Sequence, residues 1–94
     1  MEEIERIVKS LNRKGALKVL SLLTKKGEMK FNDIARAVGH SSGAGRILKD
    51  FKRLGIVKKR ELKNPLGVVM YGLTKKGLRL LTILEQLKSL EDKN

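Results

Sequence analysis

The fold is decided by residues 41–55, which read SSGAGRILKDFKRLG. At 100° per residue, this stretch separates into an apolar arc and a cationic arc on opposite sides of one helix. The apolar arc comprises Ala44, Ile47, Leu48, Phe51 and Leu54, and the opposite arc comprises Ser42, Gly45, Arg46, Lys49, Lys52 and Arg53. Ser41 or Ser42 is expected to cap this helix, and Gly55 to end it in the left-handed conformation. A helix that is apolar behind and basic in front suits the major groove of DNA.

A shorter helix is expected directly before this one. Asn32 can cap it and Gly39 can end it. The residues on its inward face are Ile34, Ala35 and Val38. Residues 29–31 are expected to form a short extended step, and a tight Gly-His-Ser turn joins the two helices. Residues 32–54 are therefore predicted to form a helix-turn-helix.

The hydrophobic period changes after Gly55. Residues 56–62 and 68–73 are rich in β-branched and aromatic side chains, and they flank a Lys-Asn-Pro-Leu-Gly turn at residues 63–67. This pattern predicts a β-hairpin, called the wing below, over about residues 56–73. Its basic residues are Lys58, Lys59, Arg60 and Lys63. Because successive strand residues point to opposite faces, only some of these cations are expected to face one ligand.

Three more helices complete a single predicted domain of residues 1–94, mainly α with a small antiparallel β wing. Two of them, over residues 2–11 and 13–24, show one-faced spacing with Asn12 as a cap between them. The third is expected over residues 74–91, capped by Thr74. Its leucine-rich stripe continues past any surface that a 94-residue chain can cover, which predicts dimerisation through the terminal helices. The expected dimer interface comprises Ile4, Ile7, Leu80, Ile83, Leu84, Leu87 and Leu90, whereas Leu78 and Leu81 point elsewhere.

The charge balance indicates a polyanionic partner. The chain holds 22 Lys and Arg against 10 Asp and Glu, for a formal net charge of +12. The excess is concentrated in residues 6–84, where 20 basic side chains face only 4 acidic ones. DNA, RNA or an anionic lipid surface would attract such a surface, and nucleic acid would release counterions on contact. The alternative, a surface that only keeps the protein soluble, usually mixes both signs.

Several classes of function are disfavoured by composition. The absence of cysteine and the presence of one histidine argue against a disulfide framework, a metal site and a metal cofactor. No nucleophile–base pair, carboxylate dyad or phosphate loop is visible, so no enzyme is expected. With no run of 18 apolar residues and no signal-peptide pattern, the chain is expected to be cytoplasmic and to have no membrane partner. Abundant lysine without cysteine or tryptophan is typical of heat-adapted intracellular proteins.

Arg46 is the best candidate for reading bases, because arginine can address guanine O6 and N7 with two bonds. Gly45 either lets a phosphate or sugar approach closely or is a plain imperfection of the helix. The candidate DNA contacts are Ser41, Ser42, Gly45, Arg46, Lys49, Arg53, Lys58, Lys59, Arg60 and Lys63. His40 is interpreted as a turn residue rather than a ligand. Tyr71 is interpreted as an anchor between wing and core, and the two phenylalanines lie on core faces, which argues against single-strand binding.

Three motifs carry a resemblance to a known group: FNDIA at residues 31–35, ILKDFKRLGIV at 47–57 and YGLTKKG at 71–77. Their order and spacing resemble the winged helix-turn-helix transcriptional regulators of the HxlR, ArsR and MarR group, in particular a small archaeal-type or thermophile regulator. The resemblance covers most of the chain. It implies a recognition helix in the major groove, a wing on the backbone or minor groove, and a homodimer. Gly43 and Gly45 depart from the group's usual hydroxyl, amide or branched side chains, and each weakens a helix by roughly 1 kcal/mol relative to alanine.

The expected function is that of a homodimeric transcriptional regulator that binds double-stranded DNA selectively. Two alternatives stay open at this point. A winged-helix module of the transcription machinery would bind protein, and an architectural protein would coat DNA without preference for sequence.

Overall fold

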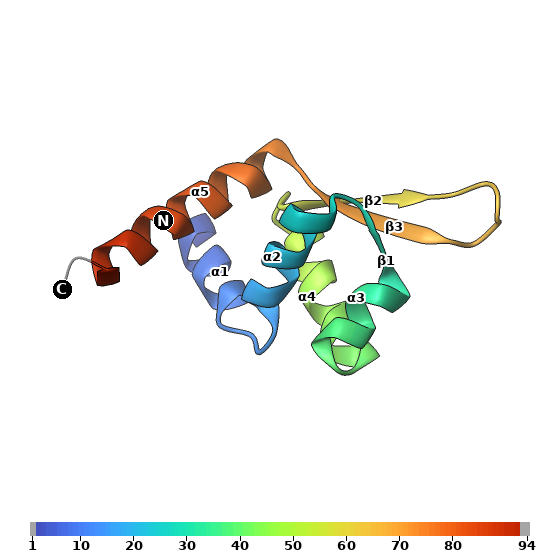
Figure 1. The fold of residues 1–94 in the computed structure, drawn as a ribbon, viewed down its shortest axis with the longest axis horizontal. Coiled ribbons are helices and arrows are strands. Elements are labelled where there is room, and N and C mark those ends of the chain that lie inside the picture. Colours follow the sequence, from blue (N-terminus) through green and yellow to red (C-terminus); the bar gives the residue numbers. More distant parts are fainter. Residues whose placement is uncertain (1, 93–94) are drawn as a thin grey trace.

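The computed structural model describes residues 2–92, which form five helices and three strands. In chain order these are α1 (Glu2–Leu11), α2 (Ala16–Lys26), β1 (Met29–Lys30), α3 (Phe31–Val38), α4 (Ser41–Arg53), β2 (Val57–Glu61), β3 (Val69–Leu73) and α5 (Lys75–Asp92). The first four helices gather into one body, and the wing and α5 extend from it in opposite directions (Figure 1). The predicted winged helix-turn-helix fold is confirmed. Within the described residues, no helix is both long and apolar enough to cross a membrane.

The core lies between α2, α3, α4 and the base of the wing. Its buried side chains are Ala16, Val19, Leu20, Leu23, Ile34, Ala35, Ala44, Ile47, Leu48, Phe51, Ile56 and Val57. Phe51 is the largest of the fully buried side chains. Truncation of a buried phenylalanine typically costs about 3–5 kcal/mol, so the apolar arc of α4 holds this helix firmly against the body. The apolar arc is as predicted, and it leaves the cationic arc to solvent.

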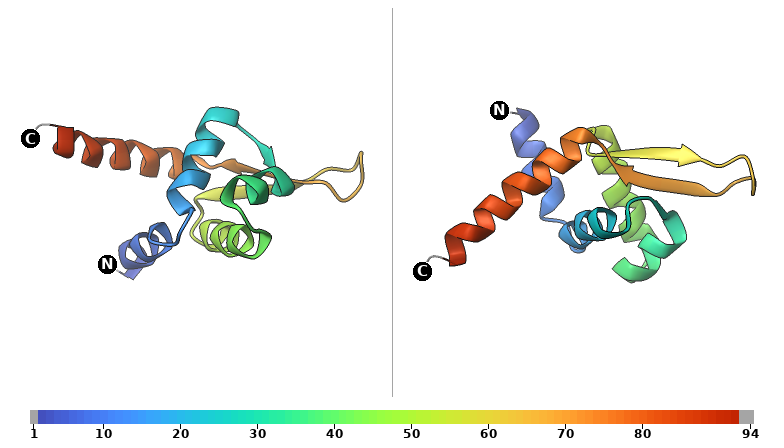
Figure 2. Two further views of the ribbon diagram at one scale, coloured as in Figure 1. Left: turned by 60° about the horizontal axis from the view of Figure 1, so that its bottom comes forward. Right: turned by 45° about the horizontal axis from the view of Figure 1, so that its top comes forward.

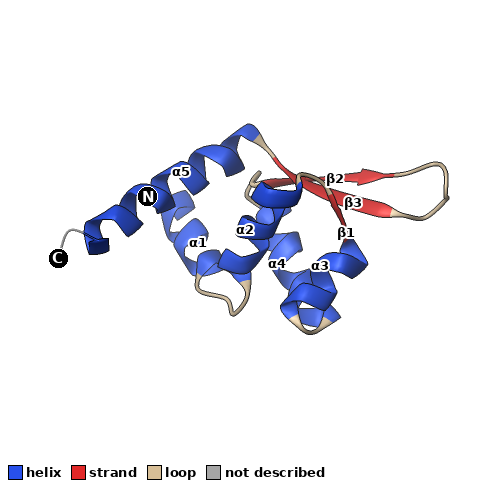
Figure 3. Cartoon of the chain, viewed as in Figure 1, coloured by secondary structure: helices blue, strands red, loops and turns tan. Residues whose placement is uncertain are grey.

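The wing belongs to a three-stranded antiparallel sheet with the strand order β1-β3-β2 (Figure 3). In the register, Tyr71 of β3 lies opposite Lys59 of β2 on one side and Met29 of β1 on the other. The extended step before α3 thus adds a third strand to the predicted hairpin. Tyr71 packs against the core, with its ring centroid 6.4 Å from that of Phe31, and so anchors the wing.

Two helix starts differ from the sequence prediction. The helix α2 begins at Ala16 instead of residue 13, after Gly15 in the left-handed conformation (φ +91°), and it has no side-chain cap. The predicted cap at Asn32 is also wrong, because α3 already begins at Phe31. The residue before it, Lys30, is paired with Met70 in the sheet, so the chain enters the helix directly from a strand.

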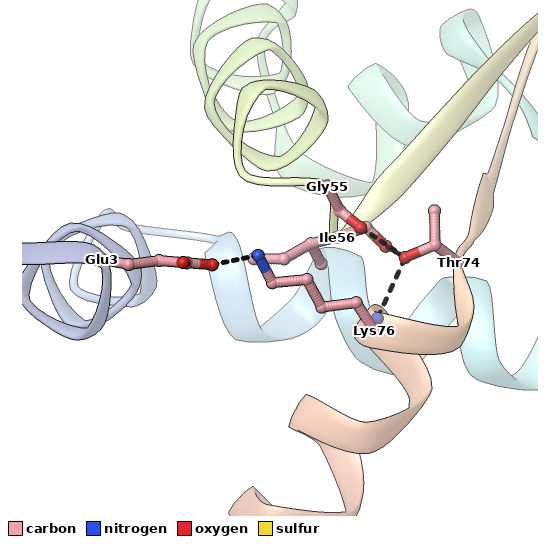
Figure 4. A network of polar contacts seen from close by, with 6 residues as sticks. Glu3, Gly55, Ile56, Thr74 and Lys76 are labelled. Atoms are coloured by element: carbon pink, nitrogen blue, oxygen red, sulfur yellow. Dashed lines mark hydrogen bonds and ion pairs between the residues drawn. The ribbon is translucent and has the colours of Figure 1, made fainter.

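The start of α5 is fixed by Thr74, as the sequence predicts (Figure 4). The Thr74 hydroxyl lies 3.1 Å from the Ile56 carbonyl oxygen and accepts a hydrogen bond from the backbone N–H of Gly77, also at 3.1 Å. A Cβ on Gly77 would collide with the Ile56 carbonyl oxygen, so only glycine allows this close approach. One residue earlier, Lys76 pairs with Glu3 and ties α5 to α1. The first turn of α5 is therefore positioned by the Thr74 cap, by the close approach of Gly77 to Ile56 and by the Lys76–Glu3 ion pair.

The leucine-rich stripe of α5 is packed against its own chain at some positions and exposed at others. Leu80 and Leu84 pack against the core of their own chain, and so does Ile7 of α1. Ile83, Leu87 and Leu90 stay 53–63% exposed. The sequence prediction assigned the whole stripe to a partner, but the nearer half of α5 still lies on the body while its end extends beyond (Figure 2).

Candidate nucleic-acid interface

The N-terminus of α4 is capped by His40, not by Ser41 or Ser42. The backbone N–H of Gly43 donates to Nδ1 of His40 at 2.9 Å, and His40 has the extended backbone conformation of an N-cap residue. The hydroxyl of Ser42 also lies 3.3 Å from the same ring nitrogen. A Cβ at Gly43 would overlap the imidazole ring, so this glycine makes room for the cap. The sequence pattern missed this role, since histidine is not among the usual N-cap residues.

We predict that His40→Ala lowers the stability of the protein by about 1 kcal/mol, because one N–H of the first turn loses its acceptor. For a chain of this size, that loss corresponds to a decrease in Tm of roughly 4–8 °C. Thermal unfolding followed by circular dichroism measures it. The matched control is His40→Asn, whose side chain can still accept the bond and should keep most of the stability. Equal stability of the alanine variant and the wild type would show that the cap is not needed.

The outward face of α4 presents three cations in a row. Arg46, Lys49 and Arg53 are exposed, and their positions at i, i+3 and i+7 place them on one side of the helix. None of the three forms an ion pair with another described residue. Ser42 lies on the same side one turn earlier, so the stripe runs nearly the full length of α4. The exposure of these side chains on one side of α4 agrees with the predicted cationic arc, and their contact with DNA stays a prediction.

Gly45 lies beside this stripe, and the space that a side chain would occupy there is empty. A Cβ added there would meet no other atom within 4 Å. Since glycine weakens a helix interior by roughly 1 kcal/mol relative to alanine, Gly45→Ala is expected to raise the stability by about that amount. Gly43→Ala is the contrasting variant and should lower the stability, because its Cβ meets the His40 ring. Thermal unfolding of the pair tests both statements, and a loss of stability in Gly45→Ala would contradict the first.

DNA titration of Gly45→Ala then separates the two interpretations of this glycine. Weaker binding by a more stable protein would mean that the DNA backbone approaches the helix closely at residue 45. Unchanged binding would mean that Gly45 is only an imperfection of the helix.

Three of the four predicted wing cations lie on β2, where they divide between the two faces of the sheet. Lys58 and Arg60 alternate with Lys59 along β2, so they point to the opposite face. Arg60 donates two hydrogen bonds to the Glu28 carboxylate, at 3.0 and 2.7 Å. This bond lowers the pKa of Glu28, and the pair is accordingly lost only when the pH falls through that lowered value. The guanidinium of Arg60 is thus engaged within the chain, and it ties the wing to the segment before β1.

Lys59 lies on the other face of the wing, toward the helix-turn-helix. It lines a shallow hollow together with Lys30 of β1 and Asn32 at the start of α3. Lys63 is exposed in the turn beyond β2. The sequence did not indicate Lys30 or Asn32 as candidate DNA contacts, because their place beside Lys59 depends on the pairing of β1 with β3. The register of a strand two residues long cannot be read from its sequence.

A second basic hollow lies beside the end of α4. Arg53 lines it together with Arg6 and Lys9 of α1, and the nearby Arg13 pairs with Asp50 at 2.8 Å. Arg53 therefore joins the stripe on α4 to further cations on α1. These α1 cations were also missed, because the contact between α1 and α4 links residues about forty positions apart.

The sequence pattern of the family described as HxlR-like helix-turn-helix matches residues 10–94. The chain belongs to this HxlR-like family. Membership makes it a DNA-binding regulator of the helix-turn-helix type and not an enzyme, as the sequence predicted. The HxlR-like chain is 34% identical over 88 residues to an uncharacterised HTH-type transcriptional regulator from Methanocaldococcus jannaschii, covering 90% of this chain and 81% of that protein. The predicted likeness to an archaeal regulator is thereby confirmed.

Two solved structures have the same fold as this HxlR-like chain. One is the reduced form of the transcriptional regulator YodB from B. subtilis, with a TM-score of 0.83 and 21% identity, covering 99% of this chain and 92% of that one. The other is the homodimeric winged helix-turn-helix DNA-binding domain of a possible ArsR-family regulator from Mycobacterium bovis. Its TM-score is 0.73 at 27% identity, covering 97% and 82% of the two chains.

Proposed function

We propose that this protein is a cytoplasmic regulator that binds double-stranded DNA selectively as a homodimer, with the α4 helix of each copy in successive major grooves. The observation that carries this proposal is the exposed stripe of Arg46, Lys49 and Arg53 on a helix whose back is fixed by the core. A rigid helix with unpaired cations facing solvent can enter a groove about 12 Å wide without rearranging.

The proposed dimer surface lies on α1 and α5. Ile4 and Val8 of α1 are 56% and 52% exposed, and Ile83, Leu87 and Leu90 of α5 are exposed as well. The Glu3–Lys76 pair ties the two helices together, so one partner can cover both. The homodimer formed by the M. bovis relative supports dimerisation as such, and the exposed apolar side chains support its placement on α1 and α5. Of the interface residues predicted from sequence, Ile7, Leu80 and Leu84 would sit beneath the surface, because they already pack on their own chain.

The wing contacts are assigned to Lys59 and Lys63. Lys59 shares its face with the start of α3, and Lys63 is exposed in the turn. Contacts of lysine to phosphate position a protein on DNA but carry no sequence information. Arg60 is instead assigned to holding the wing, through Glu28.

The test compares one helix variant with one wing variant on a selected duplex and a scrambled duplex. Arg46→Ala should cost about 1–3 kcal/mol on the selected duplex and reduce the difference between the two DNAs. Changing Lys59 and Lys63 together to alanine should weaken both DNAs alike and lower the salt dependence by up to about two units of slope.

Three other results would change the assignment. If Arg46→Ala weakens both duplexes equally while the wing variant loses discrimination, the two roles are reversed. Equal affinity of the wild type for all duplexes would favour an architectural protein. Absence of DNA binding, together with stable binding to a component of the transcription machinery, would favour a protein-interaction module.

A further inference from the structure

The tip of the wing carries an uncovered apolar side chain. Leu66 is 86% exposed, whereas the other large exposed apolar residues of the described chain are 50–63% exposed. The tip projects beyond the helical body at the end of the paired strands (Figure 1). No part of the described chain therefore covers Leu66, and its burial requires a partner.

The charges of the hairpin indicate what that partner is. Residues 64–67 read Asn-Pro-Leu-Gly and carry no charge, while Lys63 begins the same turn and Lys59 lies further back on β2. Lys63 is the only cation of this turn, and Leu66 is its most exposed apolar side chain. In this arrangement Lys59 and Lys63 can meet the two phosphate backbones while the uncharged residues 64–67 reach between them. The minor groove is about 6 Å wide, and it admits a narrow tip such as this one.

We propose that Leu66 is a wedge that enters the minor groove, partly unstacks one base step and kinks the DNA. This inference rests on the proposed function, because it requires the chain to bind duplex DNA. Apolar side chains of this kind separate base steps in other minor-groove proteins, with kinks of about 20–90°. The unstacking cost is offset by burial of Leu66 and by closer contact of the bent backbone with Lys59 and Lys63.

A wedge also adds selectivity at a position that α4 does not touch. Pyrimidine–purine steps such as TA and CA are the most easily unstacked. The preferred site should therefore hold such a step where the wing tip meets the minor groove. This preference would partly replace the base-reading groups that are absent at Gly43 and Gly45.

The experiment measures DNA bending by energy transfer between dyes at the two ends of a selected duplex of about 30 base pairs. The wild-type protein should shorten the distance between the ends by a bend of about 20–90°. Leu66→Ala should abolish most of the bend while the affinity changes less than about tenfold, since the lost contact and the avoided unstacking offset each other. Leu66→Phe should keep the bend. The matched control is Leu17→Ala on α2, another exposed leucine, which should leave the bend unchanged.

A second measurement uses only the wild-type protein. Duplexes with 2-aminopurine at successive positions should show increased fluorescence at one step, where the wing unstacks the bases. The wedge is overturned if wild-type protein binds without bending or unstacking the DNA, or if Leu66→Ala bends it as the wild type does. Failure of the wild type to bind any duplex would instead overturn the proposed function itself.

Discussion

Raising the monovalent salt from 50 to 200 mM is expected to weaken DNA binding by about 10³-fold or more, if roughly 6–10 phosphates are contacted by each dimer. The expectation follows from the 20 basic side chains among residues 6–84 and from the unpaired cations on α4. Each neutralised phosphate releases counterions, and the entropy of that release falls as salt rises. Titration of a labelled duplex at four or five salt concentrations gives the slope of log K against log[salt].

The control is the same titration with the Lys59 and Lys63 double variant, whose slope should be shallower. A scrambled duplex should show a comparable salt dependence, because phosphate contacts do not read sequence. Binding that is independent of salt would exclude contact with the backbone through these basic surfaces, and the interface proposed on α4 and the wing would be wrong.

Leu87→Lys is expected to convert the dimer into a folded monomer. Leu87 is 54% exposed on its own chain, so a lysine there does not disturb the core. In the proposed dimer, however, the charge would be buried at a cost of several kcal/mol, which weakens association by about 100-fold or more. DNA binding should weaken as well, because a single recognition helix contacts only one half-site. Sedimentation velocity on variant and wild type measures the assembly state.

Thr82→Lys provides the matched control. Thr82 is exposed on the same helix but lies off the arc of Ile83, Leu87 and Leu90, so the same change in charge should leave the dimer intact. A wild-type protein that sediments as a monomer at tens of micromolar would remove the dimer proposal. Equal effects of the two lysines would mean that α5 associates through charge rather than through its apolar arc.

Features that depend on local pattern could be predicted from the sequence. The two arcs of α4 follow from its helical period, and Gly55 (φ +77°) and Thr74 act at the positions where a stop and a cap were expected. The wing was predicted within one residue at the ends of each strand, since the change from helical to alternating period is abrupt at Gly55. These signals lie within a few residues of the structure that they specify.

Features that depend on distant contacts could not be predicted. Glu28 pairs with Arg60 across 32 residues, and that pairing decides which cations of the wing stay free. Which residues of the α5 stripe are packed and which are exposed depends on where the helical body ends beside α5. The hydrophobic period of the sequence does not contain this information. His40 can cap α4 only because Gly43 has no side chain and leaves space for the imidazole ring. His40 and Gly43, neither of which is a usual residue at the start of a recognition helix, therefore form the cap together.

The central claim is that two copies of this chain read two half-sites on double-stranded DNA. Selection of bound sequences from a random duplex pool, with the purified full chain, tests it most directly. We predict an enriched near-palindrome whose half-sites are about 10–10.5 base pairs apart from centre to centre, the spacing of successive major grooves on one side of the helix. Recovery of sequences with no common motif, or of one half-site without its inverted repeat, would contradict the account.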